Sequence, residues 1–338
     1  MRTEFLHDTP EDIARAASLL QNGELVAFPT ETVYGLGADA RREDSVRAVF
    51  AAKGRPADNP LIVHIAELSQ IGDIAAEIPE IALRLADAFW PGPLTMVLPK
   101  RDCIPMVTSG GLDTVGIRMP SHPVARALIR ESRCPIAAPS ANRSGKPSPT
   151  TARHVMDDMD GRIAAVLDGG LCEVGVESTV ICFDDADTIH ILRPGLISKE
   201  DLEPYASRVY VDKAIYEQIA PDAKVASPGM KYKHYSPDAK ILPIDAPDFE
   251  SFAKYVQAHS GEGVYCLLFD ADPEIPGVPA MRYGDSGAQQ AHFLFLRFRE
   301  LDEAGAKTVY VRMPRQDGAD LSVYNRLMRA AGFEVIRI

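Results

Sequence analysis

The sequence predicts an α/β protein with two units, a larger one built on a mixed sheet and a smaller, doubly wound one. Helical and strand patterns alternate along nearly the whole chain, which is typical of α/β proteins. In the first part, some strands follow one another without a helix between them, which favours a mixed sheet over a purely parallel one. After residue 239, strands and helices alternate regularly, as in βαβ units.

The larger unit begins with a well-capped helix. Thr9 is a typical N-cap, Pro10 suits the first helical position, and Gly23 can end the helix. A second amphipathic helix is expected from about Glu43 to its C-cap at Gly54. The remaining elements are helices at 79–90 and 123–132, a short helix with a capping box at 198–201, and strands at 24–30, 61–66, 94–98, 115–119, 134–139, 163–168, 178–183 and 189–193.

The smaller unit follows a segment without periodicity. Residues 207–238 include a stretch rich in Pro, Gly, Lys and Tyr, which is typical of a linker. The predicted organisation is therefore a first domain at 1–206, a linker at 207–238 and a second domain at 239–338. Strands at 241–245, 263–269, 308–313 and 333–338 alternate with helices at 249–259, 288–304 and 321–331, which predicts a small Rossmann-like domain.

Composition and charge exclude several classes of protein. The 338 residues are 46% hydrophobic and 25% charged, which is ordinary for a globular protein, and the net charge of −12 argues against a surface that coats nucleic acid or an anionic membrane. We expect no leader peptide, no membrane span and a cytoplasmic location. Histidines lack metal-site spacing, so no protein-built metal site is expected. Scattered, reduced thiols are expected at Cys103, Cys134, Cys172, Cys182 and Cys266.

A glycine motif near residue 35 imitates a dinucleotide-binding fingerprint. Gly35 to Ala40 match G-x-G-x-x-A, but polar or bulky residues separate them from the preceding strand and the next helix starts only near Glu43. We therefore interpret Gly35 and Gly37 as a bend where the backbone approaches another group closely.

Lys53 lies on the apolar face of its helix, where an ammonium group is unexpected. One reading is a lysine that caps the helix dipole and reaches out to solvent. The other is functional, because Arg55 follows on a loop stiffened by prolines and the two cations could clamp phosphates.

Two further polar residues interrupt apolar strands. A lone histidine such as His64 is more often a core residue than a catalytic one. Arg118 must find an anion, which could be an Asp or Glu side chain or the carboxylate of a ligand.

The segment 139–150 places small hydroxyl and amide side chains and a glycine at the end of an apolar strand. Such a run offers many donors for a phosphate or an adenine, although a surface turn that caps the next helix explains its last three residues equally well. No nucleophile paired with a base is evident, so covalent catalysis is not expected.

Eight segments together resemble the YrdC-like threonylcarbamoyl-AMP synthases in their long, two-domain form. They are PTETVYGLGADA (29–40), KGRPADNPLIVHI (53–65), FWPGPLTMVL (89–98), GIRMPSHPVARALI (116–129), PIAAPSANRSGKPSPT (135–150), GVESTVI (175–181), ILRPG (191–195) and SPGMKYKHYSP (227–237). The resemblance implies a twisted, mixed sheet with a concave face in the first domain. It also implies synthesis of L-threonylcarbamoyl-adenylate and pyrophosphate from ATP, L-threonine and bicarbonate, for threonylcarbamoyladenosine modification of tRNA beside the anticodon.

The resemblance also implies roles for individual residues. Lys53, Arg55 and Ser140 would be catalytic. ATP would be held by these three with Asn59, Thr114, Asn142, Ser148, Arg193 and Tyr235, and His234 or Lys231 could join Tyr235 from the linker. L-Threonine would be held by Thr32, His64, Arg118, the backbone at Ala138, and Ser178.

The implied chemistry needs positioning and charge neutralisation more than an acid–base pair. Mg²⁺ would bind through the ATP phosphates, and the product would pass to a tRNA threonylcarbamoyl-transferase complex, with little or no direct binding of tRNA by this chain. One alternative is an RNA-binding or ribosome-maturation module that uses the concave face of the first domain. Another keeps the chemistry but forms a carbamoyl-adenylate from carbamoyl phosphate.

Overall fold

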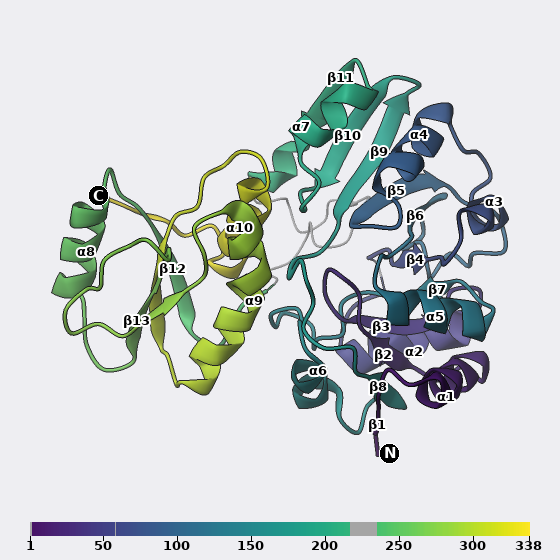
Figure 1. Cartoon of the computed structure of the whole chain (residues 1–338), viewed down its shortest axis with the longest axis horizontal. Helices are drawn as coiled ribbons and strands as arrows, with labels where there is room; N and C mark the ends of the chain where they lie inside the picture. The colour runs from purple at the N-terminus through teal and green to yellow at the C-terminus, as the bar shows by residue number, and fades with distance from the viewer. Residues whose placement is uncertain (1, 58, 217–234) are drawn as a thin grey trace.

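The computed structural model describes residues 2–57, 59–216 and 235–338, which form a large mixed sheet and a smaller parallel sheet (Figure 1). The large sheet contains, in spatial order, β1 (Glu4–Leu6), β8 (Ala165–Leu167), β2 (Val26–Phe28), β3 (Gly35–Asp39), β7 (Ile136–Ala137), β4 (Ile62–His64), β6 (Thr114–Arg118), β5 (Leu94–Pro99), β9 (Thr179–Asp185), β10 (Thr188–Arg193) and β11 (Arg208–Val211). It contains both parallel and antiparallel pairs, so the predicted mixed sheet is confirmed.

Two of the helices in the first domain begin at the N-caps that the sequence predicts. The helices of this domain are α1 (Pro10–Gln21), α2 (Glu43–Lys53), α3 (Ile71–Ile74), α4 (Glu80–Phe89), α5 (Pro123–Ser132), α6 (Ala152–Met159) and α7 (Lys199–Leu202). The Thr9 hydroxyl accepts the N–H of Asp12, and Ser198 forms the expected capping box with Asp201. Thr151 caps α6, the helix that follows the segment 139–150.

The segment 35–39 forms strand β3, so the interpretation of its glycines as a bend was wrong. Gly37 pairs with Val26 of the antiparallel strand β2. A Cβ at Gly37 would lie 2.9 Å from side-chain atoms of both Phe28 and Ile136, so glycine is needed there for a close approach rather than for a turn. The strand–turn–helix geometry of a dinucleotide site is not formed by these residues.

The second domain is a regular α/β unit. Its strands are parallel and lie in the order β14 (Ala280–Arg282), β13 (Val264–Leu268), β15 (Thr308–Arg312), β12 (Lys240–Asp245) and β16 (Ile336–Arg337). The helices are α8 (Phe249–Ala258), α9 (Gly287–Glu303) and α10 (Asp320–Ala330). In Figure 1, α8 lies on the outer side of this sheet, whereas α9 and α10 lie between it and the first domain.

The two domains share a buried interface. Val33, Val174 and Val176 of the first domain belong to the same apolar cluster as Phe295 and Phe298 of α9. Burial of such a continuous apolar surface favours one fixed arrangement of the domains over free relative motion.

The first sheet continues past the expected domain boundary at residue 206. Arg208–Val211 forms β11, which pairs in parallel with β10. Residues 217–234 of the expected linker lie outside the described residues. No helix in the described part of the chain is both long and apolar enough to cross a bilayer.

Candidate functional site

One pocket collects most of the side chains that the sequence analysis singled out. It is lined by the ends of β4, β6 and β7, by the end of α2 and by the segments that flank β9 and β10. The predicted residues that line it are Thr32, Lys53, Arg55, His64, Arg118, Ala138, Ser140, Asn142, Ser178, Arg193 and Tyr235. The pairing of β4 with β6 places His64 opposite Arg118, which explains how residues far apart in sequence meet.

Lys53 is turned inward, so the reading in which it reaches out to solvent was wrong. It is the last residue of α2, and Gly54 ends the helix in the left-handed conformation at φ 64°. The Lys53 ammonium donates to the backbone carbonyls of Ser140 and of Asn142, the latter at 2.7 Å. Burial, followed by the charge of Arg55, holds the pKa of Lys53 well below its ordinary value.

The loop after β7 is held in a defined conformation by its own polar side chains. The Ser140 hydroxyl donates to Oδ1 of Asn142 at 2.6 Å, and Nδ2 of Asn142 donates to the carbonyls of Arg143 and Lys146. Lys53 donates to the backbone of this loop, and Lys53, Ser140 and Asn142 line the same pocket. Such a preorganised set suits an anionic ligand.

Arg118 has a protein carboxylate as its partner. Its Nη2 lies 2.7 Å from Oε1 of Glu31, and both side chains are only 4% exposed. Nη1 donates to the hydroxyl of Thr32 at 2.9 Å. The sequence left open whether the anion beside Arg118 is an acidic side chain or a ligand carboxylate. The structure shows an acidic side chain, Glu31, and the Arg118 guanidinium also lines the pocket. A ligand carboxylate would therefore meet a guanidinium whose orientation is already fixed.

His64 lies where the buried strand β4 meets the pocket. It is buried, its Nδ1 lies 3.3 Å from the carbonyl oxygen of Ile136, and it also lines the pocket. Burial, followed by the charge of Arg118, lowers the pKa of His64 to about 3. The imidazole is therefore neutral at physiological pH and can contribute contact and hydrogen bonding, but not charge.

Glu177 joins the pocket wall to the second domain. Its Oε1 accepts the hydroxyl of Ser148 at 2.5 Å, and its Oε2 lies 2.8 Å from Nε of Arg326 on α10. Burial opposes ionisation of Glu177, but Arg326, Arg193 and the Ser148 hydroxyl outweigh it and lower the pKa of Glu177 below its ordinary value. The carboxylate therefore stays charged in the buried network.

Arg193 and Ser178 meet beside this carboxylate. Nη2 of Arg193 donates to the Ser178 hydroxyl and Nε to the Ser178 carbonyl, each at 3.1 Å. Burial lowers the pKa of Arg193 to about 10, so it remains a cation at neutral pH. The positive charges of Lys53, Arg55 and Arg193 thus border one pocket.

Tyr235, which lies within the expected linker, completes the pocket. Its ring stacks on Phe295 of α9 at a centroid distance of 5.2 Å, and the guanidinium of Arg326 lies 5.6 Å from the ring centroid. Its backbone adopts a positive φ of 67°, which is uncommon for a bulky residue. The roles suggested for His234 and Lys231 fall outside the described residues.

Three predicted site residues do not line the pocket. Ser148 is buried behind the wall and contacts it through Glu177. Asn59 is buried, and its amide has no hydrogen-bond partner among the described residues. Thr114 lies at the start of β6, whereas Arg118 at the end of that strand reaches the pocket. Their proposed contacts with ATP stay predictions.

Sequence reasoning missed Glu31, Glu177 and Arg326. The two glutamates lie in loops, where an acidic side chain is usually solvated, and their partners are remote in sequence. Arg326 did carry a signal, because it lies between Val323, Leu327 and Ala330 on the apolar face of its helix. Like Lys53, Arg326 is a charged residue on the apolar face of its helix, and it could have been singled out for the same reason.

Comparisons with known proteins give a consistent family assignment. The family model described as "Telomere recombination" matches residues 18–195, and the one described as "Threonylcarbamoyl-AMP synthase, C-terminal domain" matches residues 197–332. The chain is 46% identical to threonylcarbamoyl-AMP synthase of Bacillus subtilis, with 99% of this chain and 97% of that protein covered. Identity to threonylcarbamoyl-AMP synthase of Pyrococcus abyssi is 44%, with coverage of 96% and 95%.

A solved structure agrees with these relatives. Sua5 from P. abyssi in complex with L-threonine superposes with a TM-score of 0.92 at 41% identity, covering 100% of both chains. These similarities support the synthase interpretation and not the RNA-binding alternative. The chain therefore belongs to the YrdC-like family of threonylcarbamoyl-AMP synthases, in the form that carries the family's C-terminal domain.

Proposed function

We propose that the pocket around Lys53 and Arg118 makes L-threonylcarbamoyl-adenylate from ATP, L-threonine and bicarbonate, with release of pyrophosphate. The observation that carries this proposal is the meeting of several buried or half-buried cations with the hydroxyls of Thr32 and Ser140 in one pocket. An ATP-dependent adenylation must neutralise a triphosphate and orient an acceptor, and this arrangement suits both tasks. The relation to Sua5 bound to L-threonine supports the choice of amino acid.

The two sides of the pocket suggest two subsites. Lys53, Arg55, Ser140 and Asn142 lie together and would bind the phosphates of ATP. On the other side, Arg118 would bind the carboxylate of threonine, with Thr32 and His64 beside it. Ser178 and Arg193 would lie between these groups and Glu177. Thr114, Asn59 and Ser148 would act on ATP only if the pocket rearranges on binding.

The reaction then needs few proton transfers from side chains. Bicarbonate takes a proton from the threonine ammonium group and loses water to give CO₂. The free amine attacks CO₂ and releases a proton to solvent, and the resulting carbamate oxygen attacks the α-phosphorus as pyrophosphate leaves. Lys53 and Arg55 would stabilise the charge that develops on the departing pyrophosphate. Arg118 would hold the amino acid so that its carbamate approaches opposite the leaving group.

Mg²⁺ would be held through the ATP phosphates rather than by a carboxylate cage. Among the described residues, the two carboxylates at or beside the pocket are already engaged, Glu31 with Arg118 and Glu177 with Arg326. This donor set fits an ion that arrives with the nucleotide and would neutralise phosphate charge.

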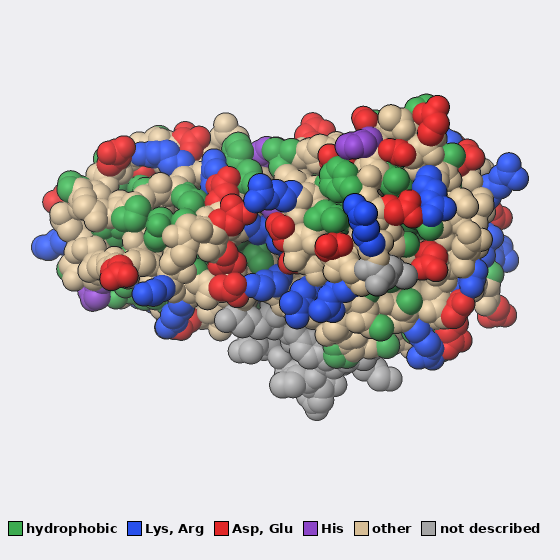
Figure 2. Space-filling model, turned by 90° about the horizontal axis from the view of Figure 1, so that it is seen from below, with side chains coloured by type: hydrophobic (Ala, Val, Ile, Leu, Met, Phe, Trp, Pro, Cys, Tyr) green, Lys and Arg blue, Asp and Glu red, His purple; other side chains and the backbone are tan. Residues whose placement is uncertain are grey.

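The product would pass to a tRNA threonylcarbamoyl-transferase complex. Figure 2 shows Lys and Arg side chains mixed with Asp and Glu over the face it displays, so that face is not uniformly basic.

Pyrophosphate release measured with each substrate omitted in turn tests the proposal. We expect release from ATP only when both L-threonine and bicarbonate are present, and a product with the mass of threonylcarbamoyl-adenylate. D-Threonine serves as a control for the shape of the threonine subsite. Release that does not depend on L-threonine would contradict the proposal, and dependence on carbamoyl phosphate would favour carbamoyl-adenylate synthesis instead.

A further inference from the structure

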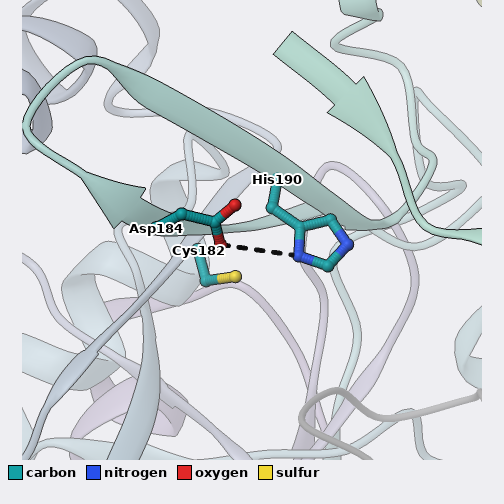
Figure 3. Close-up of side chains that lie close together, drawn as sticks. All are labelled: Cys182, Asp184 and His190. Atoms are coloured by element: carbon teal, nitrogen blue, oxygen red, sulfur yellow. Dashed lines mark ion pairs between the residues drawn. The ribbon is translucent and has the colours of Figure 1, made fainter. Parts of the chain in front are cut away.

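The outer edge of the large sheet carries a cluster of side chains that the proposed reaction does not use. Cys182 and Asp184 lie on β9 and His190 lies on β10, and Figure 3 shows the three side chains converging. One ligand atom from each, the Cys182 Sγ, an Asp184 carboxylate oxygen and a ring nitrogen of His190, lie within 4.8 Å of one another. We propose that these three residues bind one divalent transition-metal ion of the zinc class, with water in the fourth position.

Strand pairing explains why these residues meet although no local spacing motif is present. His190 is the direct cross-strand partner of Cys182 in the antiparallel pair of β9 and β10. Asp184 lies two residues after Cys182 and thus on the same face of the strand. A thiolate, an imidazole and a carboxylate are the ligand types that zinc prefers, and three protein ligands with one open position form a common zinc coordination set.

Neighbouring groups fix the orientation of the imidazole. Its ring stacks on Tyr210 of β11 at a centroid distance of 4.3 Å. Oδ2 of Asp212 lies 2.9 Å from Nε2, while Nδ1 faces Asp184. Oδ1 of Asp212 accepts the backbone N–H of Ala214, which holds that carboxylate in place. A carboxylate on the far nitrogen of a histidine is the usual outer support of a metal-binding imidazole.

A hydrogen bond also fixes the orientation of the Asp184 carboxylate. Oδ2 of Asp184 accepts the hydroxyl of Tyr210, which leaves Oδ1 turned toward His190 at 3.9 Å from Nδ1. That distance is too long for a hydrogen bond. Metal–ligand bonds of about 2.0–2.3 Å hold tetrahedral ligand atoms roughly 3.3–3.6 Å apart, so the ligand atoms would need to approach one another by up to about 1.5 Å to bind an ion.

Contacts of His190 with the two acids Asp184 and Asp212 are the simpler explanation of this geometry, and they leave the Cys182 thiol unexplained. The Cys182 thiol has no hydrogen-bond partner among the described residues, yet it faces the same gap as Nδ1. Burial, followed by the charges of Asp184 and Asp212, raises the pKa of this thiol to about 11. The same negative charges would attract a cation, and binding would release the thiol proton.

Titration of the chelator-treated, full-length protein with Co²⁺ and Zn²⁺, without ATP, tests the site. We expect one Co²⁺ per chain with a sulfur-to-cobalt charge-transfer band and the intense visible absorption of tetrahedral cobalt, displaced by Zn²⁺. Cys182→Ser should abolish the band, and His190→Gln and Asp184→Asn should weaken binding at least 10-fold. Asp212→Asn should weaken it about 10- to 100-fold, as expected for an outer support.

Matched variants control for other thiols and histidines. Cys103→Ser and His259→Gln change exposed residues outside the cluster and should leave the band and the affinity unchanged. Zn²⁺ should raise the melting temperature of the wild type and of these controls, but not of Cys182→Ser. Asp184 is exposed, so Asp184→Asn remains informative if a substitution at Cys182 disturbs folding. A missing charge-transfer band in the wild type, or equal metal binding by wild type and Asp184→Asn, would overturn the proposal.

Discussion

Nε of Arg326 lies 2.8 Å from Oε2 of Glu177, and this buried contact connects the C-terminal domain directly to the wall of the pocket. Arg326 is fully buried, and its guanidinium also lies beneath the ring of Tyr235. A side chain of α10 therefore contacts two pocket residues at once. This arrangement suggests that the second domain supports the shape of the proposed active site.

We expect Arg326→Met to destabilise the fold and to lower activity. It removes the ion-pair partner of a buried carboxylate, which typically costs about 3–5 kcal/mol of unfolding free energy. Arg326→Met combined with Glu177→Gln should recover part of that loss, because the side chain that lost its partner is then neutral. Chemical denaturation measures both effects, and pyrophosphate release reports whether the pocket keeps its shape.

Arg315→Met is the matched control for this pair. Arg315 forms an ion pair with Asp317 on the surface, with side-chain exposures of 79% and 65%. Exposed pairs contribute about 0–1 kcal/mol, so this substitution should change stability little. A similar cost for Arg315→Met and Arg326→Met would show that Glu177 is not held by the buried pair.

Lys53→Met should impair turnover more than it impairs folding. The Lys53 ammonium is bound to the backbone of the Ser140–Asn142 loop, and we propose that it also faces the phosphates of ATP. Loss of one such preorganised charge should lower kcat about 10²- to 10³-fold. Lys254→Met, at an exposed position of α8, is the control and should leave kcat unchanged. Comparable kcat values for the two variants would exclude a role of Lys53 in the reaction.

Glu31→Gln should weaken the use of threonine selectively. Glu31 holds Arg118 by a buried contact of 2.7 Å, while Arg118 would bind the threonine carboxylate. Replacing the charged partner should let the guanidinium shift and raise KM for L-threonine about 10-fold, with little change in KM for ATP. Glu67→Gln changes a half-exposed pair with Arg130 and should alter neither constant. An equal rise in both KM values would indicate a general loss of pocket structure instead.

The sequence predicted the parts of this fold that depend on local signals. Strong apolar periodicity and capping residues identified the helix that ends at Lys53, and β-branched runs identified most strands. The strand at 35–39 was missed because its glycines have low strand propensity, and only the close approach of Phe28 and Ile136 explains them.

The pocket was predictable where a residue conflicts with its local surroundings. Lys53 and Arg118 are charged positions in apolar elements, and both line the pocket. Glu31 and Glu177 do not stand out in the same way, because a glutamate in a loop is usually solvated. Only the positions of Arg118 and Arg326 explain why these two are buried. Long-range pairing of charges is set by tertiary packing, which local periodicity does not encode.

The stability of the protein should fall as the pH is lowered from about 6.5 to 5, because two buried histidines cannot accept protons in the folded state. Burial is the main cause that lowers the pKa of His64 to about 3 and that of His154 to about 4, whereas an unfolded histidine has a pKa of about 6.5. In this window the unfolded chain binds protons that the folded chain does not, so each histidine should reduce the unfolding free energy by up to about 1.4 kcal/mol per pH unit. Denaturation curves between pH 5 and 7 give this slope.

His64→Asn should remove about half of this histidine-dependent slope, whereas exposed His259→Gln should leave it unchanged. An identical slope in His64→Asn and the wild type would mean that the pKa of His64 is the same in the folded and unfolded states, which would contradict this prediction.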